Sequence, residues 1–208
     1  MMDSGTVFLI KEGKKGDRSA LNSLFARYQV RVLRIVRLRL NAELREALRV
    51  QSMDILQDVF EHAFKKIQDF EPASDASFLH WLSRIVENII RDRLDYVTAG
   101  KRSSSAEVSL DQSIILSNQR MHLRDMIPYE GTSPSQLVFK HGRMRMADEL
   151  LLELKEPERE LIIQRELEGL SFREMAAEAG KTEDAIRKQY ARSFQKLTDL
   201  AEGTGLTI

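Results

Sequence analysis

The sequence predicts an all-α protein made of two small helical domains joined by a flexible linker, with a helix-turn-helix as the C-terminal domain. Apolar residues recur every three or four positions in several long segments, which is the spacing of one helix face. Proline and glycine fall mostly at the borders of these segments. Between residues 98 and 133 the composition shifts to serine, glycine and other turn formers. We therefore expect a helical bundle over 1–97, a linker over 98–133 and a helix-turn-helix domain over 134–208.

The first expected helix covers residues 17–40. Part of it, "VRVLRIVRLRL", also alternates as a strand would, but the helical spacing extends over a longer stretch and favours a helix. Its predicted core residues are Leu21, Leu24, Tyr28, Val32 and Ile35.

Two more helices complete the predicted bundle. The second covers residues 52–70, is strongly amphipathic and ends before Pro72. The third follows a short "EPASDAS" loop, where Ser77 can cap its first turn. The predicted core positions are Met53, Leu56, Phe60, Phe64 and Ile67 in the second helix, and Phe78, Leu82, Ile85, Ile89 and Val97 in the third.

The C-terminal segment is divided into shorter helices. A helix over 135–154 comes first, and the turn over 179–182 has the length found in a DNA-reading helix-turn-helix. In such a motif the second helix enters the major groove. The local signals are Pro157 in a first turn, Gly169 and Gly180 at helix ends, the capping box of Ser171 and Glu174, and Thr182 as the cap of the last helix.

Composition restricts the function classes. The chain has 32 basic and 32 acidic residues, and this zero net charge argues against strong DNA binding by the chain alone. It has no cysteine, no signal peptide and no apolar run long enough to span a membrane, so we expect a soluble cytosolic protein without membrane insertion. No phosphate-binding loop, nucleophile elbow or metal-ligand pattern is present. We therefore expect no catalytic residues, no metal and no cofactor.

Basic residues gather on two of the predicted helices. Arg187 and Lys188 lie near the start of the last helix, where they can reach base edges or phosphates, and Arg192 lies further along. The third helix of the bundle combines an aromatic residue with polar and basic residues on one face, namely Trp81, Arg84, Asn88 and Arg91. A solvated basic face, and a core position for Trp81, are the structural alternatives.

A polar face on the second helix includes Asp54, Gln57 and Asp58. An acidic patch repels DNA, so the alternatives are simple solvation and a basic protein partner. Composition alone favours solvation.

Two segments resemble those of extracytoplasmic-function sigma factors. "DILQDVFEHAFKKIQDFEP" with "FLHWLSRIVENIIRDRLDY" resembles region 2, which melts promoters, and "LKEPERELIIQRELEGLSFREMAAEAGKTEDAIRKQYARSFQKL" resembles region 4. The resemblance implies that the chain binds core RNA polymerase and promoter DNA. It leaves open whether an anti-sigma factor binds the chain.

The resemblance also implies roles for individual residues. Asp54, Gln57 and Asp58 match the polymerase-binding face. Phe70 and the loop after it match the segment that captures a flipped base of the minus-ten element, beside Trp81, Arg84, Asn88 and Arg91. The residues expected at the minus-thirty-five element are Thr182, Arg187, Lys188 and Arg192.

The chain departs from the family pattern at Gln189 and Phe194, where basic residues are common, which implies weaker or different duplex recognition. One alternative function is a helix-turn-helix transcriptional regulator whose N-terminal bundle senses a ligand or dimerises. A second is an interaction protein that holds a regulator without opening promoters. Transcription assays with core polymerase distinguish these from a sigma factor.

Overall fold

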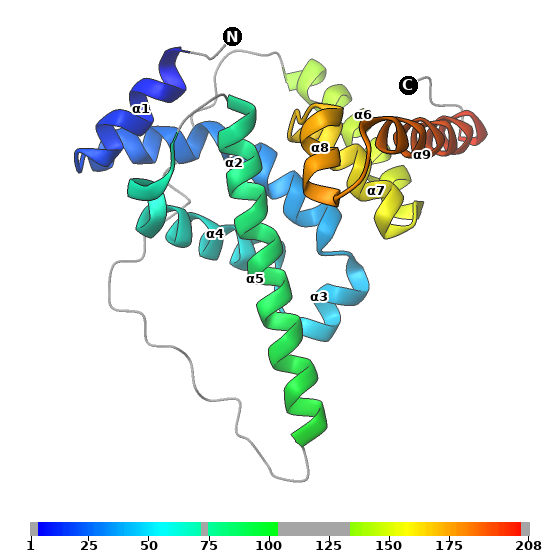
Figure 1. Cartoon of the computed structure of the whole chain (residues 1–208), viewed down its shortest axis with the longest axis horizontal. Helices are drawn as coiled ribbons and strands as arrows, with labels where there is room; N and C mark the ends of the chain where they lie inside the picture. Colours follow the sequence, from blue (N-terminus) through cyan, green and yellow to red (C-terminus); the bar gives the residue numbers. More distant parts are fainter. Residues whose placement is uncertain (1–3, 72–74, 104–133, 205–208) are drawn as a thin grey trace.

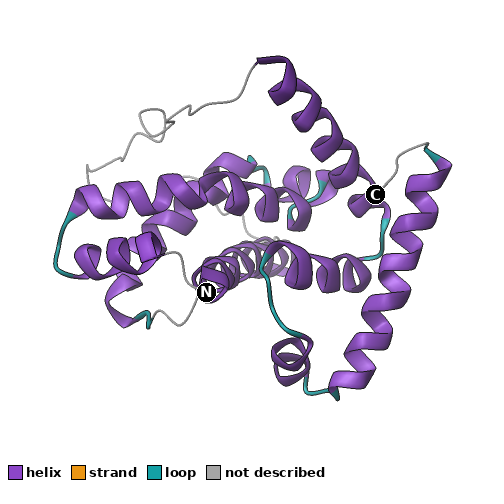
Figure 2. Cartoon of the chain, turned by 90° about the horizontal axis from the view of Figure 1, so that it is seen from above, coloured by secondary structure: helices purple, strands orange, loops and turns teal. Residues whose placement is uncertain are grey.

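The computed structural model describes residues 4–71, 75–103 and 134–204. Within these ranges every regular element is a helix, which confirms the predicted all-α class (Figure 2). The elements in chain order are α1 (Ser4–Lys14), α2 (Arg18–Arg39), α3 (Ala42–Leu48), α4 (Ser52–Lys66), the 3-10 turn η1 (Ile67–Asp69), α5 (Asp75–Ser103), α6 (Pro134–Glu153), α7 (Glu156–Ile162), the π-helical turn η3 (Ile163–Leu167), α8 (Phe172–Ala179) and α9 (Glu183–Gly203).

The N-terminal bundle comprises α1 to α5, in which α2, α4 and α5 pack against one another and α1 packs on α2 (Figure 1). The predicted apolar positions of the three long helices are buried or half-buried, with two exceptions on α4. Met53 is 43% exposed and Phe64 is 40% exposed. At about 100° per residue, both lie at the edge of the buried stripe that includes Val59 and Ala63. The predicted apolar face of α4 was therefore too wide.

Two short helices, α1 and α3, were not predicted. Asn41 caps α3 by accepting a hydrogen bond from the Leu44 amide at 2.9 Å. A Cβ atom on Gly13 would lie 2.2 Å from the Leu21 side chain, so the approach of α1 to α2 requires glycine there.

The predicted borders of α5 were inaccurate at both ends. The helix begins at Asp75, so Ser77 lies inside the first turns and is not the cap. It continues to Ser103, so the first six residues of the predicted linker, 98–103, are helical. The loop residues 72–74 and the rest of the predicted linker, 104–133, lie outside the described residues.

The C-terminal module comprises α6 to α9, and its predicted helix signals are confirmed. Pro157 lies in the first turn of α7, and Ser171 and Glu174 form a capping box at the start of α8. Gly180 ends α8 in the left-handed conformation, with φ 61°, and Thr182 caps α9. Phe194, whose spacing on the last helix favours the core, is 37% exposed.

The two modules pack directly against each other. Helix α6 and the turn η3 contact α2, and the C-terminal module lies to one side of α2 and α5 (Figure 1). The large hydrophobic cluster of the bundle continues into the C-terminal module through buried residues such as Leu150, Leu154 and Ile163. Among the described residues, no helix is both long and apolar enough to cross a membrane.

Candidate functional site

The start of α9 presents the basic residues predicted to read duplex DNA. Thr182 accepts a hydrogen bond from the Ala185 amide at 3.2 Å and so fixes the first turn. Arg187, Lys188 and Arg192 are exposed, and Arg187 donates to Glu183 at 2.6 Å. Such exposed ion pairs contribute little to stability, about 0.3 to 0.5 kcal/mol. The guanidinium group can therefore exchange its carboxylate partner for a phosphate.

Phe172, which sequence reasoning missed, orders one of these residues. Two guanidinium groups lie over its ring, with the Cζ atom of Arg165 at 4.6 Å and that of Arg187 at 5.0 Å from the ring centroid. Stacking on a ring face restricts the rotamers of a long side chain. The signal in the sequence was an aromatic residue directly after the capping Ser171, a position that by itself indicates only a helix start.

The predicted minus-ten residues fall into two sets. Arg84, Asn88 and Arg91 are exposed along α5, and Arg84 donates to Glu87 at 2.6 Å. Phe70 is only 8% exposed, and Trp81 is half-buried. The structure thus places a polar face beside an aromatic group that is largely packed inside.

That aromatic group consists of Phe70, Phe78 and Trp81. The ring centroid of Phe70 lies 5.3 Å from that of Phe78 and 4.8 Å from that of Trp81. Phe78 is fully buried, which confirms its predicted core position. Phe70 therefore contributes to packing of the bundle in this structure.

The polar face of α4 is less exposed than its composition indicated. Asp54 is exposed and accepts a hydrogen bond from the Gln51 amide at 2.8 Å, as part of a capping box. Gln57 and Asp58 are half-buried, and Asp58 forms an ion pair with Arg93 of α5. Substitutions at Asp58 consequently affect a contact between two helices as well as the surface.

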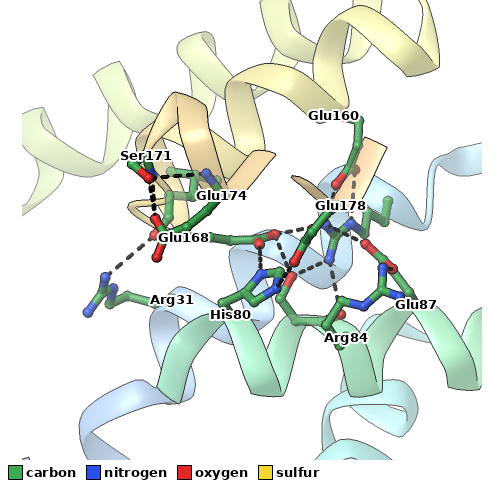
Figure 3. Close-up of polar contacts among 12 residues, drawn as sticks. Arg31, His80, Arg84, Glu87, Glu160, Glu168, Ser171, Glu174 and Glu178 are labelled. Carbon is green, nitrogen blue, oxygen red and sulfur yellow. Dashed lines mark hydrogen bonds and ion pairs between the residues drawn. The ribbon is translucent and has the colours of Figure 1, made fainter. Parts of the chain in front are cut away.

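Sequence reasoning also missed a set of charged and polar residues at the contact between the two modules, which we call the intermodule cluster (Figure 3). It is distributed over five elements or their flanks. Its members are Arg39 of α2, His80, Ser83, Arg84 and Glu87 of α5, Glu160 of α7, Glu168 between η3 and α8, and Glu178 of α8.

Arg39 lies at the centre of the cluster, with its side chain only 8% exposed. Its guanidinium group donates to both carboxylate oxygens of Glu160 and, from Nη2, to Glu168 Oε1 at 2.8 Å. Glu87 Oε1 lies 3.0 Å from the same nitrogen. Burial lowers the pKa of Arg39, but the hydrogen bond to Glu160 and the nearby carboxylates raise the pKa above its ordinary value. Arg39 is therefore cationic.

Glu168 joins Arg39 to α5. Its carboxylate accepts from Ser83 Oγ at 2.5 Å and lies 2.7 Å from His80 Nδ1, and the residue is 1% exposed. Burial raises the pKa of Glu168, but hydrogen bonds from His80 and Ser83 and the charge of Arg39 outweigh it and lower the pKa. Glu168 is thus a buried carboxylate with a partner at each oxygen.

His80 lies between two carboxylates of the C-terminal module, as Figure 3 shows. Its Nδ1 is 2.7 Å from Glu168 Oε2, and its Nε2 is 2.6 Å from Glu178 Oε1. A neutral imidazole has one N–H group, whereas an imidazolium can donate to both carboxylates. The hydrogen bond to Glu168 raises the pKa of His80, and burial opposes this effect only in part.

Two segments of the chain match models of known protein families. Residues 24–97 match Sigma-70 region 2, and residues 144–197 match Sigma-70, region 4. The chain belongs to the sigma-70 family of RNA polymerase sigma factors. The first match lies within the N-terminal bundle and the second within the C-terminal module, in the same order as the two segments that resemble regions 2 and 4.

Within that family the chain is an extracytoplasmic-function (ECF) sigma factor. It is 28% identical over 168 residues to the ECF RNA polymerase sigma-E factor of Haemophilus influenzae, a match that spans 81% of this chain and 80% of that protein. It is also 28% identical over 170 residues to the sigma-E factor of Escherichia coli K12, with the same coverage. The solved structure of CnrH in complex with the cytosolic domain of CnrY shares the fold, with a TM-score of 0.54, 21% identity, and coverage of 96% of this chain and 99% of that chain.

Sigma factors are transcription initiation factors and not catalysts. The chain accordingly acts in transcription initiation, with core RNA polymerase and promoter DNA as its partners.

Proposed function

We propose that the two modules divide promoter recognition, with α9 binding the minus-thirty-five duplex and α5 binding the minus-ten element. The observation that carries this proposal is the capped helix-turn-helix, in which Thr182 fixes the start of α9 and basic side chains are exposed in its first turns. A helix presented in this way can enter a major groove with its N-terminal residues on base edges. Arg187 and Lys188 then contact bases or phosphates, and Arg192 contacts the DNA backbone.

On α5 the exposed residues Arg84, Asn88 and Arg91 contact the minus-ten strand. The packing of the aromatic group refines the expected roles of its members. Trp81 is half-buried and keeps a partly accessible ring on which an unpaired base can stack, whereas Phe70 supports that ring from within the bundle. Capture of a flipped base therefore depends on Trp81 directly and on Phe70 through packing.

The third surface is the polar face of α4, through which the chain binds core polymerase. Asp54 is exposed there, and Gln57 and Asp58 lie beside it, half-buried. Carboxylates on this face fit a basic surface of the polymerase and disfavour DNA. Since core polymerase is cytoplasmic, the chain acts in the cytoplasm. CnrH, which shares the fold, was solved with the cytosolic domain of CnrY, and a regulatory protein such as an anti-sigma factor is a corresponding partner for this chain.

Run-off transcription tests the proposed function. Core polymerase is incubated with the chain and a library of random upstream sequences on a common reporter template, and transcribed templates are sequenced. We expect enrichment of two upstream motifs, near minus ten and minus thirty-five. Arg187→Ala with Lys188→Ala should erase the preference for the motif near minus thirty-five and leave the preference for the motif near minus ten unchanged. If the free chain bound DNA tightly and core polymerase initiated no transcription with it, the helix-turn-helix regulator would be the better interpretation.

A further inference from the structure

Helix α1 packs firmly on the bundle, although it precedes the segment that matches Sigma-70 region 2, residues 24–97. Ile10 is fully buried, and the close approach of Gly13 to Leu21 brings the end of α1 next to the start of α2. Helix α1 also contacts the 3-10 turn η1, which directly precedes Phe70. The end of α1 and the segment that carries Phe70 therefore lie side by side.

Lys14 in the last turn of α1 is bonded to the chain on both sides of Phe70. The side-chain amide of Gln68 donates to the backbone carbonyl of Lys14, with 2.8 Å between Nε2 and O. The Nζ atom of Lys14 lies 3.0 Å from Oε1 of Glu71. Gln68 precedes Phe70 by two positions and Glu71 follows it directly. Lys14 thus holds both flanks of Phe70 to the end of α1.

The two contacts differ in strength. The side chain of Glu71 is 88% exposed, and an ion pair at such a position contributes little. The carbonyl of Lys14, by contrast, belongs to a helix end, where carbonyl groups need partners from outside the helix. The carbonyls of residues 11–13 accept from the backbone amides of residues 15–17, and the carbonyl of Lys14 accepts from Gln68. The hydrogen bond from Gln68 is therefore the stronger of the two contacts.

Phe70 depends on such a contact because its own turn is short. The turn η1 has three residues, and the amide of Phe70 donates to the carbonyl of Ile67 at 3.3 Å. The ring of Phe70 nevertheless lies in a defined position, 4.8 Å from that of Trp81 with an angle of 33° between the ring planes. A shift of η1 would move this ring and change the support that it gives to Trp81.

Helix α1 reaches the same aromatic group by a second route. The buried hydroxyl oxygens of Thr6 and Tyr28 are 3.2 Å apart. The ring of Tyr28 packs edge-on against that of Phe78, with 4.9 Å between the centroids. Phe78 in turn contacts both Phe70 and Trp81. The start of α1 and its end therefore both contact residues that support the ring of Trp81.

We propose that α1 belongs to the minus-ten recognition site, with Gln68 and Lys14 as positioning residues that keep Phe70 against Trp81 during capture of the flipped base. This inference rests on the proposed function, because it requires an unpaired base to stack on Trp81. Neither positioning residue touches DNA, and both act through Phe70. Loss of their contact should slow promoter opening and leave recognition of the minus-thirty-five duplex unchanged.

Gln68→Met tests the stronger contact, because methionine has a similar length but no donor. Gln68 is exposed, so folding should tolerate the change. Core polymerase with the whole chain is mixed with a promoter that carries a fluorescent aminopurine base in the minus-ten element, and fluorescence rises when that base unstacks. The rate of this rise should fall about two- to fivefold, the effect of one exposed hydrogen bond, with closed-complex binding unchanged. A premelted template should remove most of the difference.

Asn41→Ala is the matched control for lost stability. It removes the cap of α3, a hydrogen bond of 2.9 Å to the Leu44 amide, and should lower the Tm at least as much as Gln68→Met does. Lys14 precedes α2 and Asn41 follows it, so the 22 residues of α2 separate them by roughly 33 Å. Because this cap lies far from η1, the control should unstack the aminopurine base as fast as the parent does.

The outcomes distinguish this inference from the proposed function. If Gln68→Met unstacked the base as fast as the parent, or were equally slow on the premelted template, the inference would be overturned and the proposed function would stand. A defect in Asn41→Ala as large as that in Gln68→Met would also overturn the inference, because the effect would then follow stability. If the parent itself gave no fluorescence rise with core polymerase, base capture in the proposed function would be wrong, and the inference with it.

Discussion

Truncation of Phe70 to alanine should destabilise the bundle and slow promoter opening, and the two effects can be measured separately. Phe70 is 8% exposed, and its ring contacts those of Phe78 and Trp81. Removing a nearly buried ring costs about 3 kcal/mol at the lower end of the range for Phe→Ala. At about 2 to 4 °C per kcal/mol for a chain of this size, Tm should fall by about 6 to 12 °C. Thermal unfolding followed by circular dichroism measures this loss.

The kinetic part of the prediction needs a second variant. Phe70→Leu keeps most of the apolar volume and should cost less than about 1.5 kcal/mol, but it removes the ring that supports Trp81. Below the Tm of both variants, each should slow opening of a duplex promoter while leaving closed-complex binding nearly intact, and a premelted template should hide much of the defect. If activity falls equally on duplex and premelted templates, or only in proportion to lost stability, Phe70 has no part in base capture. A change in Tm below about 2 °C would contradict its packing role.

The remaining predictions concern the other surfaces. Arg187→Ala with Lys188→Ala should weaken the dependence of transcription on the upstream element by roughly 1 to 3 kcal/mol for each base that is no longer read. The measurement compares transcription from templates with and without that element. If the variant depended on the element as strongly as the parent, α9 would not be the reading helix. Asp58→Arg should weaken binding to core polymerase in a competition assay. The swap Asp58→Arg with Arg93→Glu restores the ion pair with α5, and if it also restores binding, the single variant acted through folding and not through the polymerase face. The free chain should bind duplex DNA weakly at physiological salt, since its net charge is zero, and a filter-binding Kd in the nanomolar range would contradict this. The contact between the two modules should depend on pH through His80. Because the pKa of His80 is raised above 6.5 in the folded chain, its contribution to the free energy of unfolding is full below pH 6.5 and is lost as pH rises through the raised pKa. The Tm should therefore fall more between about pH 6 and pH 9 in the parent than in His80→Gln, and an equal fall in both would contradict this role of His80.

The pH prediction depends on which groups surround the ring. The imidazole of His80 contacts Glu168 and Glu178 directly. Hydrogen bonds from Ser171 lower the pKa of Glu174 of α8, and the charge of His80 lowers it further. Arg39 reaches the ring only through Glu168, and its own charge persists over the whole range tested. Glu168, whose pKa is lowered, stays ionised in that window, and histidine is the side chain whose ordinary pKa, about 6.5, lies within it.

The sequence predicted those parts of the fold that depend on neighbouring residues. The capping box of Ser171 and Glu174, the left-handed Gly180 and the cap Thr182 are all set by side chains within a few positions, and all three were confirmed. Apolar spacing predicted the buried faces of α2, α4 and α5. It failed at Met53 and Phe64, because periodicity gives the direction of a face and its neighbours in space set its width.

The intermodule cluster could not be predicted in this way. Arg39 and Glu168 are 129 positions apart, and each is one of several like residues in its segment. No local pattern distinguishes an arginine that will be buried beside three carboxylates from one that will face water. The exposed candidates on α9 and α5, by contrast, were found because basic residues at helical spacing form a local pattern, although their contacts with DNA stay a prediction.

The π-helical turn η3 makes the position of Glu168 sensitive to the number of residues in the turn. A π turn holds one residue more than an α-helical turn, and here it directly precedes Glu168. Deleting one residue from η3 would rotate everything that follows by about 100° relative to α7, and Glu168 with it. The caps of α8 and α9 would be untouched, since they depend only on residues beyond that point. A single codon lost at this turn would thus displace Glu168 from Arg39 and His80 while preserving the caps of α8 and α9.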